Sequence, residues 1–103
     1  MNRPQLADIT AVIGGTGTGK THWMRQEVRR RNPARLLVWD PEADLSDFGQ
    51  VVPAEQLASL AQLTEGERWR LVYVPPFDRD KAERAFNAFC RLAFLRAEQG
   101  RAP

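Results

Sequence analysis

Cysteine and histidine each occur only once in this sequence, and no long apolar run is present. The single thiol, Cys90, excludes an internal disulfide and agrees with a reducing compartment. A nucleophilic cysteine needs a base nearby, and the only histidine, His22, is far away in sequence, so we expect Cys90 to be a plain buried thiol on a helix. No apolar stretch approaches the ~18 residues of a membrane span. Residues 1–5 also lack the apolar character of a signal peptide, so we expect a cytoplasmic protein without membrane association.

Net charge is small as well, at +2 from 15 basic and 13 acidic residues. Such a balance is not by itself a signature of nucleic-acid binding. Basic side chains gather at the end of the first predicted helix and in the turn after it, at Arg25, Arg29, Arg30, Arg31 and Arg35. We interpret this cluster as a solvated helix face, and a surface for DNA or an acidic partner is the alternative. The cluster has no aromatic residues interleaved with its arginines, so it lacks the pattern that indicates base stacking.

The strongest functional signal is a glycine-rich run that fits the phosphate-binding pattern G-x-x-x-x-G-K-T. Its members are Gly14, Gly15, Thr16, Gly17, Thr18, Gly19, Lys20 and Thr21. Glycines let the backbone curl closely around a triphosphate, so that consecutive N–H groups bind it. Lys20 would reach the β- and γ-phosphates and act in catalysis, while the Thr21 hydroxyl would bind Mg²⁺. The motif therefore predicts ATP and Mg²⁺ as ligands, and no motif separates ATP from GTP.

The motif has the flanking elements that a phosphate-binding loop requires. Upstream, residues 9–13 form a short apolar run with β-branched members, as expected for a parallel strand that is buried on both faces. Downstream, residues 20–31 contain no glycine or proline and place Thr21, Met24 and Val28 at helical spacing. One face of this helix can pack on a sheet while its N-terminus points at the anion.

The next part of the chain continues the alternation of strands and helices. Asn32 and Pro33 end the first helix, because the residue before a proline is pushed out of helical geometry. An apolar strand over residues 36–39 follows, and then a loop over 41–50 that is rich in turn formers and acids. A brief extended piece at residues 51–52 leads into a helix over 53–63.

The last strand and helix complete the predicted domain. Prolines 75 and 76 follow the strand over residues 69–74 and indicate a position near the sheet edge. The final helix is capped by Asp80 with Glu83, or alternatively by Asp78. Its wide apolar face is assigned to the core and consists of Phe86, Phe89, Cys90, Ala93 and Phe94. The order of elements predicts a single α/β domain over residues 1–103, a three-layer α/β/α P-loop sandwich on a mostly parallel sheet.

One acid is placed to take part in nucleotide chemistry. Asp40 follows the strand over residues 36–39, so it should share a sheet edge with the P-loop if the strands are parallel. A hydrolysing P-loop protein normally has an acid at the tip of an apolar strand, where it holds Mg²⁺ through water. The strand over 69–74 ends on prolines, so Asp40 is the sole candidate and joins Thr21 as a predicted metal residue.

Three segments, residues 14–21, 36–41 and 69–100, together resemble the N-terminal half of P-loop ATPases in the HerA/FtsK-like group. Within that group they are most similar to phage and prophage ATPases of the genome-packaging and zonula occludens toxin-like kinds. The resemblance implies ATP binding by residues 14–21, a bacterial or phage-infected host, and a structural or indirect role for Asp40. It also implies a later, acid-bearing Walker B strand between the strands 9–13 and 36–39, and that strand is absent here. We therefore expect an incomplete sheet that is open in its middle, in an N-terminal piece of a longer ATPase or in a chain completed by a second copy or another chain.

These observations leave three hypotheses for function. The first is a phage or prophage motor that hydrolyses ATP and translocates or packages DNA. The second is a small-molecule kinase, in which Asp40 holds Mg²⁺ or a substrate hydroxyl and the 41–50 loop covers it. The third is a non-catalytic nucleotide-binding or interaction module, such as a prophage remnant. Neither a catalytic acid nor an arginine finger can be assigned for the first.

Overall fold

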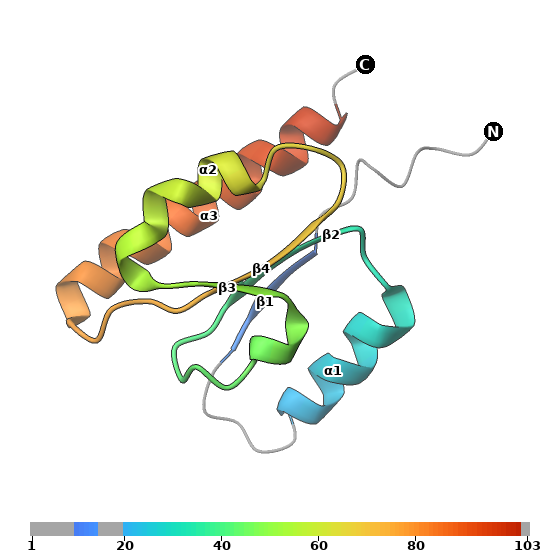
Figure 1. Cartoon of the computed structure of the whole chain (residues 1–103), viewed down its shortest axis with the longest axis horizontal. Coiled ribbons are helices and arrows are strands. Elements are labelled where there is room, and N and C mark those ends of the chain that lie inside the picture. The colour runs from blue at the N-terminus through green and yellow to red at the C-terminus, as the bar shows by residue number, and fades with distance from the viewer. Residues whose placement is uncertain (1–9, 15–19, 102–103) are drawn as a thin grey trace.

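The computed structural model of the chain describes residues 10–14 and 20–101 (Figure 1). Its strands are β1 (Thr10–Ile13), β2 (Arg35–Trp39), β3 (Gln50–Val52) and β4 (Trp69–Tyr73). Its α-helices are α1 (Lys20–Arg31), α2 (Leu60–Leu63) and α3 (Arg79–Arg101). Two short 3-10 helices flank β3 in the chain: η2 (Ser46–Phe48) precedes it and η3 (Ala54–Ser59) follows it. The region predicted as one helix over residues 53–63 consists of η3 and α2, and its backbone leaves helical geometry at Gln56, within η3.

The four strands form one parallel sheet in the order β1-β2-β4-β3. Helix α1 and η2 lie over one face, and α2 and α3 lie over the other (Figure 1). Strand β2 is buried along its whole length, as the apolar run over residues 36–39 predicts for a strand covered on both faces. The predicted α/β class and the parallel sheet are therefore confirmed.

Two expectations about strand order are wrong. Strand β1 pairs directly with β2, from Thr10 opposite Leu36 to Ile13 opposite Trp39, so the sheet is not open between them. Strand β4 lies inside the sheet between β2 and β3 rather than near its edge. The prolines at 75 and 76 do not disturb this arrangement, because the last backbone bond of the ladder comes before them, from Val74 N–H to Val52 O at 3.1 Å.

Each face of the sheet carries its own apolar core. Between the sheet and α3, the Trp39 ring lies 4.9 Å from that of Phe86 and 5.2 Å from that of Phe89, both in edge-to-face geometry. On the opposite face, Val28 of α1 packs with a second cluster that includes Val12, Leu36, Val38, Leu45, Phe48 and Val72. Residues from the 41–50 loop are thus part of the core on the α1 side.

The ends of two helices follow the sequence signals closely. Asn32 closes α1 in the left-handed conformation with φ 48°, and its N–H donates to Val28 O at 2.8 Å. Asp78 caps α3, because its Oδ2 accepts from the Lys81 N–H at 2.9 Å. The alternative cap is therefore the one observed, and Asp80 lies within the first turn.

The apolar face of α3 is narrower than predicted. Phe89 is buried and Phe86 and Ala93 are partly buried, but Cys90 is exposed and the Phe94 side chain is 67% exposed. The expectation of a buried thiol is wrong because Cys90 lies one residue, and so about 100° of helix rotation, beyond Phe89. In the part of the chain that the structure describes, no helix, not even the 23-residue α3, has the length and apolar character to span a membrane.

Tyr73 supplies a pH-dependent test of this core. Its side chain is fully buried, and its hydroxyl donates to Ala54 O at 3.0 Å. Burial, and secondarily the negative charge of Glu55, raise the pKa of Tyr73 above its usual value. A raised pKa means that the neutral phenol stabilises the fold below the unfolded-state pKa of about 10 and that this contribution is lost as pH rises through the folded-state pKa.

We expect the phenolate absorbance of the native protein to titrate at higher pH than in the denatured protein. Tyr73 is the only tyrosine in the sequence, so the signal belongs to one group. Tyr73→Phe should remove the signal and lower the free energy of unfolding by about 1 kcal/mol, because one hydrogen bond is lost. If the phenolate absorbance titrated at the same pH in the native and the denatured protein, the burial of this hydroxyl would be contradicted.

Candidate functional site

The predicted P-loop joins β1 to α1 at the carboxyl edge of the parallel sheet. Gly14 directly follows β1, and α1 begins at Lys20, as the sequence predicts. Gly15, Thr16, Gly17, Thr18 and Gly19 lie outside the described residues, as do the side chains of Lys20 and Thr21. The described flanks of the motif are Gly14, at the end of β1, and helix α1.

Gly14 begins the motif in a tightly packed position. Its N–H donates to Trp39 O at 2.8 Å, which extends the pairing of β1 with β2 by one residue. A Cβ atom at this position would lie 2.8 Å from Leu45 Cδ1 and 3.2 Å from Trp39 O. A side chain at the first glycine of the motif would therefore have to displace the Leu45 side chain.

Asp40 lies at the carboxyl end of β2, on the same sheet edge as Gly14, and is only 1% exposed. Its carboxylate accepts two backbone hydrogen bonds, from Asp44 N–H at 3.2 Å and from Leu45 N–H at 3.0 Å. Its own N–H donates to Tyr73 O at 2.8 Å. These bonds make Asp40 the anchor of the loop after β2 and turn Leu45 toward Gly14.

Among the residues that the structure describes, no cluster of metal ligands surrounds Asp40. Within residues 10–14 and 20–101, no three His, Cys, Asp or Glu side chains come together in a way that could hold a metal ion. Metal binding by Thr21 and Asp40 therefore stays a prediction, and the observed geometry of Asp40 is that of a structural carboxylate.

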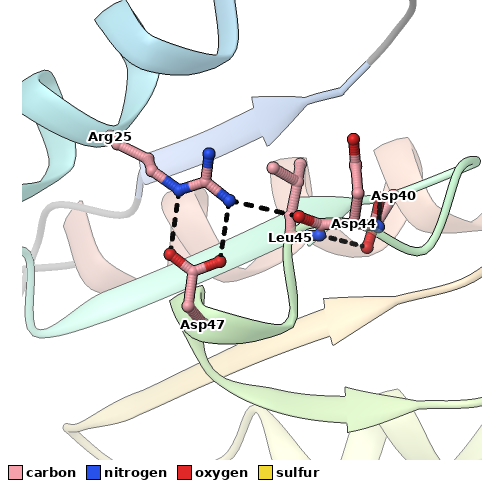
Figure 2. Close-up of polar contacts among 5 residues, drawn as sticks. All are labelled: Arg25, Asp40, Asp44, Leu45 and Asp47. Carbon is pink, nitrogen blue, oxygen red and sulfur yellow. Dashed lines mark hydrogen bonds and ion pairs between the residues drawn. The ribbon is translucent and has the colours of Figure 1, made fainter.

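An ion pair connects the same loop to the helix that follows the P-loop (Figure 2). Arg25 of α1 donates from Nε to Asp47 Oδ2 at 2.9 Å and from Nη2 to Asp47 Oδ1 at 3.0 Å. The same Nη2 donates to the Asp44 carbonyl oxygen at 3.2 Å. The Arg25 guanidinium also lies 5.7 Å from the centre of the Phe48 ring. The hydrogen bonds raise the pKa of Arg25 and lower the pKa of Asp47.

The predicted basic cluster does not form one uniform surface. Arg25 binds Asp47, and Arg30 and Arg31 both pair with Glu27, at 2.6 and 3.5 Å. Arg35 is buried, with its guanidinium 6.0 Å from the centre of the Trp69 ring. A DNA phosphate on this side of α1 would have to compete with these carboxylates.

A cleft of about 470 Å³ lies at the same sheet edge, beyond β4 on the α3 side. It is bounded by η3 and the first turns of α3, and its polar lining includes Glu55, Lys81 and Arg84 around Tyr73 and Pro76. Sequence reasoning missed this cleft, because the residues that line it come from three separate elements and share no local pattern.

Comparison with protein-family models, with curated proteins and with solved structures found no match to this chain.

Proposed function

We propose that this chain is an ATP-binding P-loop protein and forms part of an ATPase that translocates or packages phage or prophage DNA. The observation that carries the proposal is the position of the G-x-x-x-x-G-K-T motif between a parallel strand that ends at Ile13 and a helix that begins at Lys20. Strand, glycine-rich loop and helix, in that order, are the context in which this motif binds phosphate.

The charges along α1 support an anion at its N-terminus. The first turn of α1 carries no acidic residue, and its last turn carries Arg29, Arg30 and Arg31. Carboxylates near the N-terminus would compete with a phosphate for the free N–H groups and the positive end of the helix dipole. Arginines at the other end interact favourably with the negative end of the dipole.

Calorimetric titration of Mg·ATP, followed by a turnover assay with and without DNA, tests this proposal. We expect the parent chain to bind and Lys20→Ala to lose binding, because the lysine charge on the β- and γ-phosphates is removed. Arg91→Ala is the matched control, since Arg91 is an exposed basic residue of α3 that does not line the cleft beyond β4. Equal affinities for the parent and Lys20→Ala would refute the assignment of the loop.

The turnover assay distinguishes the hypotheses by the fate of the bound nucleotide. Turnover that DNA stimulates supports the motor, whereas tight binding without turnover supports a non-catalytic nucleotide-binding module. Loss of turnover in Asp40→Ala, with the fold intact, would make Asp40 the metal-side acid after all.

The cleft beyond β4 favours one second candidate, a small-molecule phosphotransferase. A kinase needs an acceptor pocket at the carboxyl edge of the sheet, and Lys81 and Arg84 would give such a pocket affinity for an anionic acceptor. Transfer of the γ-phosphoryl group to an added hydroxyl compound, reduced by Arg84→Ala, would support this candidate over the motor.

A further inference from the structure

The segment from Asp40 to Phe48, called here the 40–48 segment, contacts both flanks of the P-loop. We propose that this segment fixes Gly14 and the start of α1 relative to each other in a way that favours nucleotide binding, with Arg25 and Asp47 as positioning residues for nucleotide affinity. The inference rests on the proposed function and assigns to the Arg25–Asp47 pair a role in nucleotide affinity that no sequence motif gives it.

On the β1 side, the contact is made by packing. Both carboxylate oxygens of Asp40 hold backbone N–H groups of the segment, which fixes Leu45 with its side chain 1% exposed. Leu45 Cδ1 lies so close to Gly14 that a Cβ there would be 2.8 Å away. The first residue of the P-loop is therefore enclosed by β2 on one side and by the 40–48 segment on another.

On the α1 side, the contact is made by charge and by packing. Arg25 lies five residues after Lys20, in the second turn of α1, and its two hydrogen bonds to Asp47 are those of a bidentate ion pair (Figure 2). Phe48 is buried in the same core as Val28 of α1. The distance between the two ends of the P-loop is thus set through the 40–48 segment as well as through the sheet.

The strength of the pair suits a role in positioning better than a role in overall stability. The Arg25 and Asp47 side chains are 33% and 56% exposed, and exposed pairs contribute little to folding. A bidentate pair nevertheless fixes orientation, because it holds two groups in one geometry. By reciprocity, if the paired segment favours nucleotide binding, bound nucleotide must in turn strengthen the contact of the segment with α1.

A double-mutant cycle with Mg·ATP titration tests the inference, using Arg25→Gln, Asp47→Asn and the double variant. We expect each single variant to lose Mg·ATP affinity on the order of fivefold, with nearly unchanged stability to urea. The double variant should bind like the single ones, because either change already breaks the pair. Arg30→Gln is the matched control, since it breaks the Arg30–Glu27 pair of the same helix and leaves the 40–48 segment untouched.

Hydrogen exchange gives a second readout that a purely structural pair would not change. We expect Mg·ATP to slow exchange of the Asp44 and Leu45 amides in the parent chain, and to do so less in Arg25→Gln. Parent-like affinity in Arg25→Gln and Asp47→Asn, while Lys20→Ala loses binding, would overturn this inference and leave the proposed function standing. No binding by the parent chain would overturn the proposed function, and this inference with it.

Discussion

Asp40→Ala is expected to lower the free energy of unfolding by about 2–4 kcal/mol. The change removes two hydrogen bonds to a charged acceptor and leaves two backbone N–H groups without their acceptor. The Asp40 side chain is almost completely buried and its oxygens accept from Asp44 and Leu45. Removing it also releases Leu45 from Gly14, so Mg·ATP affinity should fall together with stability. Urea unfolding and calorimetry on the same samples measure the two effects.

Glu42→Ala is the matched control for the change at Asp40. Glu42 lies two residues away in the same segment, carries the same charge and is exposed, so its removal should change stability by less than about 0.5 kcal/mol. A stable Asp40→Ala variant that binds Mg·ATP but does not turn it over would contradict the anchoring role. Such a result would favour the metal role that the sequence allowed.

Gly49→Ala is expected to destabilise the protein by about 1–3 kcal/mol or more, because no adjustment of a side chain can make room for the methyl group. A Cβ at Gly49 would lie 2.4 Å from the Arg70 carbonyl oxygen and 2.6 Å from its carbonyl carbon, both backbone atoms of β4. The obstacle is space and not backbone conformation, since φ at Gly49 is 173°, which any residue can adopt. Chemical denaturation of the variant measures the loss.

Gly66→Ala separates these two causes. Gly66 has φ 97°, and a Cβ there would meet nothing within 4 Å. Its replacement should therefore cost only the conformational strain, about 1 kcal/mol. A smaller loss for Gly49→Ala than for Gly66→Ala would mean that β3 and the segment before it are not pressed against β4 as observed.

Local signals were sufficient to place most elements, whereas the order of the strands was not predictable. Helical periodicity and the Asn32-Pro33 pair located α1, and continuous apolar character located β2. Pairing of β1 with β2 and of β4 with both β2 and β3 joins residues far apart in sequence, and no local pattern specifies it. The inference from Pro75 and Pro76 failed because the hydrogen-bond donor that each proline lacks belongs to a residue beyond the end of β4 at Tyr73.

The same distinction applies to the candidate site. The phosphate-binding motif is local, so it could be found directly from the residue pattern at 14–21. The Arg25–Asp47 pair joins residues 22 positions apart, and in the sequence Arg25 was only one member of an arginine cluster. Asp40 was correctly placed at the sheet edge, but its hydrogen bonds to Asp44 and Leu45 depend on the path of a loop that turn propensity alone does not determine.

The exposed position of Cys90 makes the protein accessible to single-site labelling. It is the only thiol of the chain and lies on α3, across the sheet from α1 and the 40–48 segment. A maleimide dye or spin label attached there would therefore sit away from the residues proposed to bind nucleotide. A second label on one cysteine introduced into α1 would allow the distance between the two labels to follow movements of that helix. No native residue of the P-loop would need to be replaced.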